Sequence, residues 1–334
     1  MSFFGMLNYM TTGDLQRYVA DQGFADSLLY FGAKTTSKIE ARLLFADDQS
    51  NDEYHFILRR DATGRLFFQD EKILFHAEGH DEPQEYEFGG GVKESQLKEA
   101  TDGGGGDKTL RFVYGLLSRC RVFQFHDTSS TAKIRTEGYI DDSRYLRSDA
   151  GNLAAFLRGL KMQNGGERYY ERIVRHIRQM VPQFDDFDLK PSLENENYVR
   201  LNWREQGSDY LFGPHQLSDG SLRFMALTTL FMQPPEQRPQ LIVVDEPELG
   251  LHPAAISSLA GMVKAAPPRT QVLLATQSPR LVDEFDPDQV IVVERDERRP
   301  RTVFRRLQEK KLTEWLGRYC LSELWEKNVL GGRP

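Results

Sequence analysis

Two adjacent carboxylates, Asp245 and Glu246, directly follow the apolar run Leu241–Val244. The run is too short for a helix and too uniformly apolar for a half-exposed strand, so it predicts a central parallel strand buried on both faces. Open α/β sheets bind their ligands at the carboxyl ends of such strands. There one carboxylate can hold Mg²⁺ and its neighbour can activate water, provided that phosphate is also present. The plainer alternative is a core strand followed by a polar turn.

A second polar segment, Leu217–Ser221, stands immediately before an apolar helix expected over residues 222–232. Gly220 would let the backbone approach a ligand closely, and Ser218 offers a hydroxyl group. The start of a helix presents free N–H groups to an anion. This segment is therefore a candidate phosphate contact, although short Ser/Gly turns are common.

A third motif ends the buried strand expected over residues 271–275, where Gln277 would stand at the edge of a neighbouring strand. In this order, the three motifs resemble the signature, Walker B and switch motifs of ABC-type ATPases, most closely those of the RecF/SMC-like branch, which includes bacterial "AAA family" predicted ATPases. The resemblance implies the following roles: nucleotide binding by Ser218, Asp219, Gly220 and Ser221, Mg²⁺ binding by Asp245, catalysis by Glu246 and Gln277, and a D-loop containing Glu248 and His252.

Two departures argue against a transporter subunit. Gln277 stands where transporter ATPases carry histidine, and Asp219 replaces a glycine of the transporter signature. The amide of Gln277 can still hydrogen-bond a phosphate or a water molecule, but it cannot act as an acid. The resemblance implies ATP and Mg²⁺ as cofactors and a head-to-tail homodimer that sandwiches the ATP.

The phosphate-binding string G-x-x-x-x-G-K-[ST] does not occur in the 334 residues. The nearest imitation, Gly103–Thr109, has Asp107 where the second glycine belongs and no buried strand before it, so a flexible loop is the better interpretation. In the family this string opens the first helix, and the apolar helix expected from Ser2 looks like the continuation of that helix. We therefore expect a chain that begins just past the loop, binds ATP poorly and hydrolyses little of it.

The remaining pattern predicts an α/β fold, namely a P-loop NTPase fold of the ABC-ATPase-head type without its first strand. A helix is expected over residues 2–19, with a possible break or second cap at Thr11-Thr12-Gly13. An antiparallel meander is expected from residue 38, and alternating strands and helices after residue 240. Single helices are expected over residues 152–180 and 312–325, and a polar loop between the glycines at 89–91 and 103–106. The predicted divisions are a first nucleotide-binding lobe with the β-meander, 1–130, a helical lobe ending in the signature helix, 131–233, and a core α/β lobe, 234–334.

Composition indicates a soluble, cytoplasmic protein. Hydrophobic residues make up 39% and charged residues 28% of the chain, and no apolar run reaches the length of about 18 residues that a membrane span needs. The two cysteines, Cys120 and Cys320, predict reduced thiols rather than a disulfide framework. The net charge of −7 gives no overall attraction to DNA.

Local features leave several alternatives open. The basic stretch 295–311 is either a DNA contact or a solvated hairpin. His126-Asp127 is either the counterpart of the ABC Q-loop or a capping turn, and His215 either faces a dimer partner or is solvated. For the whole chain, the alternatives to an ATPase are a catalytically silent dimerisation module and a DNA-binding factor of repair or defence that acts with DNA or a partner effector protein.

Overall fold

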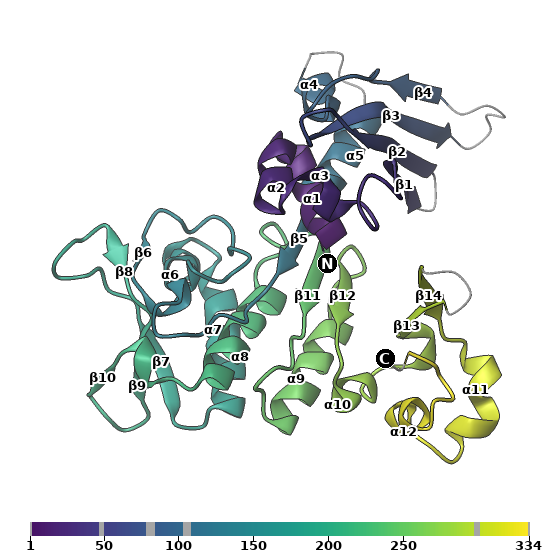
Figure 1. Cartoon of the computed structure of the whole chain (residues 1–334). Helices are drawn as coiled ribbons and strands as arrows, with labels where there is room; N and C mark the ends of the chain where they lie inside the picture. The colour runs from purple at the N-terminus through teal and green to yellow at the C-terminus, as the bar shows by residue number, and fades with distance from the viewer. Residues whose placement is uncertain (1, 47–49, 78–83, 103–107, 297–300, 333–334) are drawn as a thin grey trace. The chain divides into compact units, whose positions relative to one another are not determined.

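A computed structural model describes the chain except for residues 1, 47–49, 78–83, 103–107, 297–300 and 333–334 (Figure 1). The chain forms two compact units. Unit 1 contains residues 1–122 and 239–241, and unit 2 contains residues 123–238 and 242–334. The predicted division into three lobes stays a prediction.

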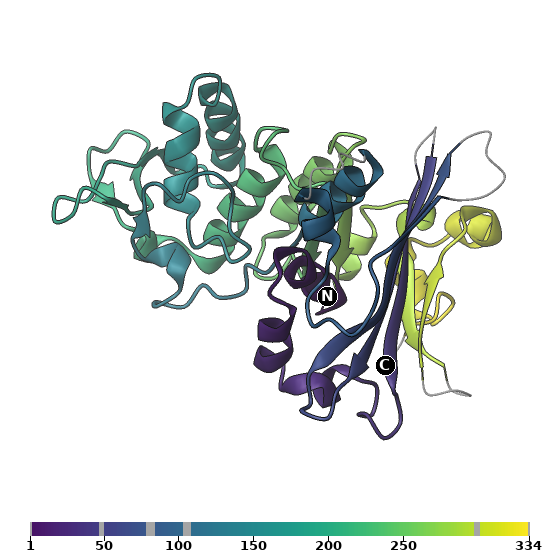
Figure 2. The ribbon, with the colours of Figure 1, turned by 90° about the horizontal axis from the view of Figure 1, so that it is seen from above.

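Unit 1 combines helices with a four-stranded antiparallel sheet in the order β1-β2-β3-β4. Figures 1 and 2 show its long strands running side by side. Its elements are α1 (Ser2–Thr12), α2 (Leu15–Asp21), α3 (Phe24–Leu28), β1 (Lys38–Ala46), β2 (Ser50–Arg60), β3 (Leu66–Ala77), β4 (Gln84–Glu87), α4 (Leu97–Asp102), α5 (Lys108–Ser118) and most of β5 (Cys120–Phe123).

Alternation along β2 and β3 builds the core of unit 1, as the period of two predicts. Tyr54, Phe56 and Phe68 are buried on one face, together with apolar side chains of α1, α2 and α5. The possible break predicted within residues 2–19 is confirmed: the chain forms two helices, and Gly13 between them adopts a φ of +77°. The polar loop predicted after residue 91 contains α4, while Gly103–Gly106 and Asp107 lie outside the described residues.

Among its described residues, unit 2 contains one three-stranded sheet, two two-stranded sheets and a pair of neighbouring strands, β11 and β12, together with helices. Its elements are β6 (Gly138–Tyr139), α6 (Leu153–Met162), α7 (Glu167–Met180), β7 (Phe184–Asp188), β8 (Tyr198–Val199), β9 (Asn202–Glu205), β10 (Leu211–Phe212), α8 (Asp219–Met232), β11 (Leu241–Asp245, of which Leu241 belongs to unit 1), α9 (Pro253–Lys264), β12 (Gln271–Ala275), α10 (Pro279–Val282), β13 (Ile291–Arg295), β14 (Thr302–Arg306), α11 (Glu309–Leu316) and α12 (Leu321–Glu326).

Helix α8 lies at the centre of unit 2, with its side chains from Phe224 to Phe231 buried and α7 and α9 packed against it. Two helix predictions were too long. The helix predicted over 152–180 breaks into α6 and α7 at Gly165, which has a φ of +80°, and the helix predicted over 312–325 is divided after Leu316. The predicted return of residues 301–307 as an antiparallel strand is confirmed by β14.

No helix within the described part of the chain is both long enough and apolar enough to cross a membrane.

Candidate functional site

Strand β11 delivers the paired carboxylates to the edge of a sheet. Ile242, Val243 and Val244 are at most 1% exposed, which confirms the predicted buried strand. The N–H of Glu246 donates to the carbonyl of Ala275, the last residue of β12, over 2.8 Å. Because both strands end at this hydrogen bond, they run in the same direction and present their carboxyl ends together. An α/β sheet binds ligands at this kind of edge.

The two residues predicted to be catalytic meet at this edge. The side-chain amide of Gln277 donates to Oε1 of Glu246 over 3.1 Å. The half-buried Asp245 precedes Glu246 directly, and its carbonyl accepts a hydrogen bond of 2.9 Å from Nε2 of His126. The segment around His126 is thus attached to the backbone of Asp245, and its role as a Q-loop counterpart stays a prediction. Asp127, by contrast, accepts hydrogen bonds from the N–H and hydroxyl groups of Ser129 and forms a capping turn.

Glu246 has an unusual backbone conformation. Its φ of +40° lies in the left-handed region, which costs a residue other than glycine on the order of 1–3 kcal/mol. The strain is held by the hydrogen bond to Ala275 and by a turn in which the N–H of Leu249 donates to the carbonyl of Glu246 over 3.1 Å. Strained residues of this kind concentrate at functional sites, where the surrounding structure fixes them.

Glu248 is attached to the neighbouring strand. Its Oε1 accepts a hydrogen bond of 2.6 Å from the hydroxyl of Thr276, and that hydroxyl in turn accepts from the N–H of Ser278 over 2.9 Å. Its Oε2 is buried and has no hydrogen-bond partner among the described residues. A contact of Glu248 with a second subunit, which the D-loop role implies, stays a prediction.

The signature segment forms the first turn of α8 rather than a loop in front of it. Ser218 is the N-cap, and its Oγ accepts from the N–H of Ser221 over 3.1 Å. The helix therefore begins at Asp219, three residues before the start expected from the apolar pattern. This cap leaves a helix N-terminus, where N–H groups favour an anion, at the exposed Ser218.

Asp219 is engaged inside its own subunit. Its carboxylate forms an ion pair of 2.7 Å with Arg135, whose guanidinium is buried and also donates to the carbonyls of Pro214 and Leu217. Hydrogen bonds from Arg135 and then Thr128 hold the pKa of the Asp219 carboxyl below its usual range. Sequence reasoning missed Arg135, because no local pattern connects it to a segment more than 80 residues away.

Two glycines let α8 approach the turn after Glu248. A Cβ on Gly220 would collide with the carbonyl oxygen of Gly250, and Gly250 itself has a φ of +73°. His252 ends this turn as the exposed N-cap of α9, with Nδ1 accepting from the N–H of Ala254 over 3.2 Å. His252 is thus the residue that caps a helix N-terminus, and its role in a subunit contact stays a prediction.

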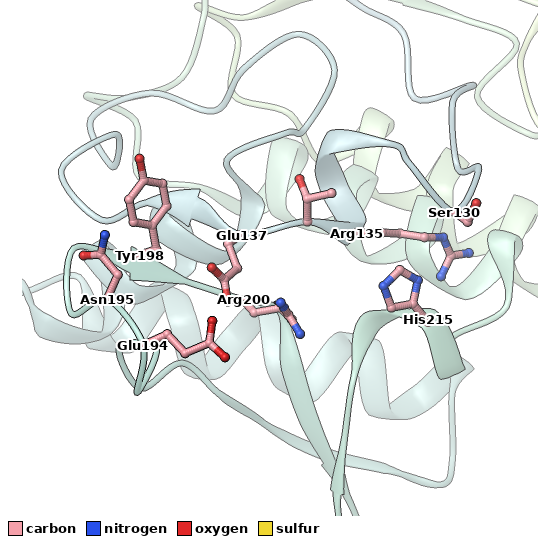
Figure 3. A pocket seen from close by; sticks show the side chains of 9 residues that line it. Ser130, Arg135, Glu137, Glu194, Asn195, Tyr198, Arg200 and His215 are labelled. Atoms are coloured by element: carbon pink, nitrogen blue, oxygen red, sulfur yellow. Dashed lines mark hydrogen bonds and ion pairs between the residues drawn. The ribbon is translucent and has the colours of Figure 1, made fainter.

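A pocket of about 470 Å³ lies elsewhere in unit 2 (Figure 3). Arg135, Arg200 and His215 are among its lining residues. Arg200 forms an ion pair of 3.0 Å with Glu137, just as Arg135 pairs with Asp219. The charges are thus largely compensated, and the pocket contains none of the carboxylates at the ends of β11 and β12. His215 is exposed, which fits both a solvated histidine and one that faces a dimer partner, so its role stays a prediction.

The donors at the sheet edge suit a magnesium–nucleotide complex rather than a metal held by protein alone. In the described ranges, no group of three or more His, Cys, Asp or Glu side chains could hold a metal ion. In nucleotide sites Mg²⁺ is held by one or two carboxylates together with phosphates and water. Asp245, half-buried at the end of β11, provides one such carboxylate.

Comparisons with known proteins agree with this architecture. The family described as "AAA domain, putative AbiEii toxin, Type IV TA system" matches residues 43–283. A solved structure of an SMC head bound to the C-terminal winged-helix domain of ScpA is similar over 93% of this chain and 88% of that chain, with a TM-score of 0.53 and 12% identity.

An SMC head with an extended coiled coil from Pyrococcus furiosus, bound to the C-terminal domain of ScpA, matches with a TM-score of 0.48 and 12% identity over 95% of this chain and 89% of that chain. No curated protein matches the sequence. The chain thus has the mixed α/β fold of SMC head ATPase domains, which confirms the predicted fold class.

Proposed function

We propose that this chain, which belongs to the family described as "AAA domain, putative AbiEii toxin, Type IV TA system", is an ATPase of the ABC/SMC type that binds and hydrolyses ATP. The observation that carries the proposal is the hydrogen bond of 3.1 Å between Gln277 and Glu246, at the edge where β11 and β12 both end. It joins a carboxylate suited to activating water with an amide suited to orienting it. The SMC-head fold supports the same class of function.

Each side chain at the edge has a distinct task in this proposal. Asp245 would hold the Mg²⁺ that accompanies ATP, and this ion supplies charge neutralisation on the phosphates. Glu246 accepts the proton of the attacking water. Gln277 fixes the carboxylate of Glu246 and offers its amide oxygen to the water or its N–H groups to a phosphate oxygen.

The signature segment acts on a second subunit. In a head-to-tail dimer, the hydroxyl of Ser218 and N–H groups at the start of α8, such as that of Gly220, face the phosphate of the opposite subunit's ATP. The Asp219–Arg135 ion pair holds this turn in place from inside. In this proposal, Asp219 affects nucleotide binding indirectly, because it fixes the positions of Ser218 and Gly220.

The 334 residues contain no G-x-x-x-x-G-K-[ST] string, so they bind ATP weakly and hydrolyse it slowly. Each charge-assisted hydrogen bond contributes roughly 1.5–3 kcal/mol, whereas millimolar to micromolar binding totals about 4–8 kcal/mol. A phosphate site without that lysine and loop loses most of the total. The alternative that this supports is a silent module that dimerises without turnover.

DNA binding by the basic stretch 295–311 is less well supported. Within its described part, Arg305 lies 3.8 Å from Glu294, and Arg301 lies 3.2 Å from Asp296. Arg306 donates to the carbonyl of Asp288. These pairings reduce the positive charge that phosphates could meet.

Light scattering of Glu246→Gln tests the proposed ATPase against the silent module. With MgATP well above its dissociation constant of about a millimolar or higher, the variant should form more dimer than wild type, because it cleaves the ATP that it binds about a hundredfold more slowly. Asp245→Asn, which weakens Mg²⁺ binding, should not accumulate as a dimer. A dimer that forms equally with and without nucleotide in all three proteins would favour the silent module.

A further inference from the structure

One arginine connects three segments of the site that are far apart in the sequence. Arg223, half-buried in the second turn of α8, donates through Nε to the carbonyl of Phe125 over 3.0 Å and through Nη1 to that of Leu249 over 3.1 Å. Its Nη2 donates to the carbonyl of His126 over 2.8 Å and reaches the hydroxyl of Thr128 at 3.2 Å. A single guanidinium thus joins α8, the residues after β5 and the turn after Glu248.

The turn that Arg223 reaches is the one that begins at the strained Glu246. It runs from Glu246, with a φ of +40°, to Gly250, with a φ of +73°. A Cβ on Gly250 would lie 2.8 Å from Nη1 of Arg223, so a larger residue there would displace the guanidinium, and the positive φ itself favours glycine. On its other side, Arg223 holds the carbonyl of His126, whose ring donates to the carbonyl of Asp245. The guanidinium of Arg223 therefore holds both the turn that follows the carboxylate pair and the segment at His126 that contacts Asp245.

We propose that Arg223 is a positioning residue that couples the signature helix to the catalytic turn of its own subunit. The inference rests on the proposed ATPase function. In a head-to-tail dimer, the signature of one subunit contacts the ATP of the other, so a displacement of α8 reaches Glu246 through Arg223. The planar guanidinium of arginine donates to several carbonyls at fixed angles. Lysine cannot replace it, because all N–H donors of its ammonium lie on one nitrogen.

Hydrogen exchange of the nucleotide-free protein tests the coupling by itself. In Arg223→Lys and Arg223→Gln, the amides of Leu249 and Leu251, which close the turn, should exchange about tenfold faster, as expected when a charge-assisted hydrogen bond is lost. Arg172→Lys is the matched control, because Arg172 donates to the carbonyl of Met232 at the opposite end of α8. Unchanged exchange at both amides, or an equal increase throughout unit 2, would overturn the proposal.

Thr128→Val provides a milder variant if substitution of Arg223 prevents folding. It removes one acceptor of the guanidinium, and it should accelerate exchange at Leu249 in the same direction but by less. No change there in a folded variant counts against the coupling.

Steady-state kinetics separate positioning from simple structural support. Arg223→Lys should lower kcat for ATP about tenfold and leave KM within about twofold, because no nucleotide contact is assigned to Arg223. An equal loss of kcat in Arg223→Lys and in the control Arg172→Lys would contradict the coupling. A change in Arg223→Lys that is confined to KM would contradict it as well. Absence of turnover in wild type refutes the proposed ATPase, and the exchange result still decides whether Arg223 holds the turn.

Discussion

The amide of Gln277 donates a hydrogen bond of 3.1 Å to the carboxylate of Glu246, across the ends of two neighbouring strands. In this arrangement, the residue expected to respond to the phosphates touches the residue expected to activate water.

Gln277→Ala should lower kcat for ATP hydrolysis by roughly ten- to a hundredfold, since a hydrogen bond to a charged group contributes about 1.5–3 kcal/mol. Phosphate release under steady state measures this. The control is Gln271→Ala, at the exposed start of β12, the strand that precedes Gln277. This variant should keep the wild-type kcat. Equal rates for both variants would exclude a role for the Gln277–Glu246 hydrogen bond.

Thr276→Val should destabilise unit 2 by about 1–3 kcal/mol, because it removes the hydrogen bond to Oε1 of Glu248 while Oε2 is already buried without a partner. Urea denaturation measures the change. Thr313→Val, whose exposed hydroxyl bonds only to its own helix α11, is the matched control and should be within about 0.5 kcal/mol of wild type. A neutral Thr276→Val would mean that water or another group satisfies Glu248.

Glu71 makes the stability of the β-meander depend on pH. Its side chain is fully buried and accepts hydrogen bonds from Tyr54, Ser95 and the N–H of Gln96, and burial raises the pKa of its carboxyl. The folded state thus keeps this proton to a higher pH than the unfolded chain. The resulting stabilisation is complete below the unfolded pKa of about 4.3 and is lost as pH rises through the raised folded value.

Glu71→Gln removes that dependence. As pH rises from about 4 to about 7, the free energy of unfolding of Glu71→Gln should increase relative to that of wild type. Denaturation at several pH values measures it, with the exposed Glu99→Gln as the control. A difference that stays constant over this range, or shifts toward wild type, would show that the buried carboxyl does not titrate as described.

The strongest parts of the sequence prediction depend on local patterns. The apolar run before Asp245 fixed β11, and the step from polar Ser218 to apolar residues located α8, because burial and N-capping act within a few residues. The meander was predictable for the same reason. The breaks at Gly165 and after Leu316 were missed because helical apolar spacing resumes beyond them.

The contacts that organise the site could not be predicted locally. Arg135 and Arg223 bind carbonyl groups as far as 98 residues away in the chain, and nothing next to either arginine in the sequence distinguishes it from a solvent-exposed one. The family resemblance implies a nucleotide contact for Asp219, which stays a prediction, and the sequence gives no sign of its ion pair with Arg135. The roles of Asp245, Glu246 and Gln277 in catalysis remain predictions that the geometry supports.

Calorimetry should show weak ATP binding by the 334-residue chain, with a dissociation constant of about a millimolar or higher, because it contains no phosphate-loop string. Asp245→Asn should weaken the Mg²⁺-dependent part of that binding further. The control is ADP without Mg²⁺, which should bind alike to both proteins. Micromolar or tighter binding of ATP by wild type would mean that other residues of this chain cradle the phosphates.

The central claim is that the carboxylate of Glu246 activates the attacking water. Single-turnover hydrolysis of radiolabelled ATP, with protein in excess and Mg²⁺ present, tests it most directly by comparing wild type with Glu246→Gln. The account predicts slow but measurable cleavage by wild type and a rate at least about a hundredfold lower for the variant, as expected when a general base is removed. Equal rates in the two proteins would contradict it.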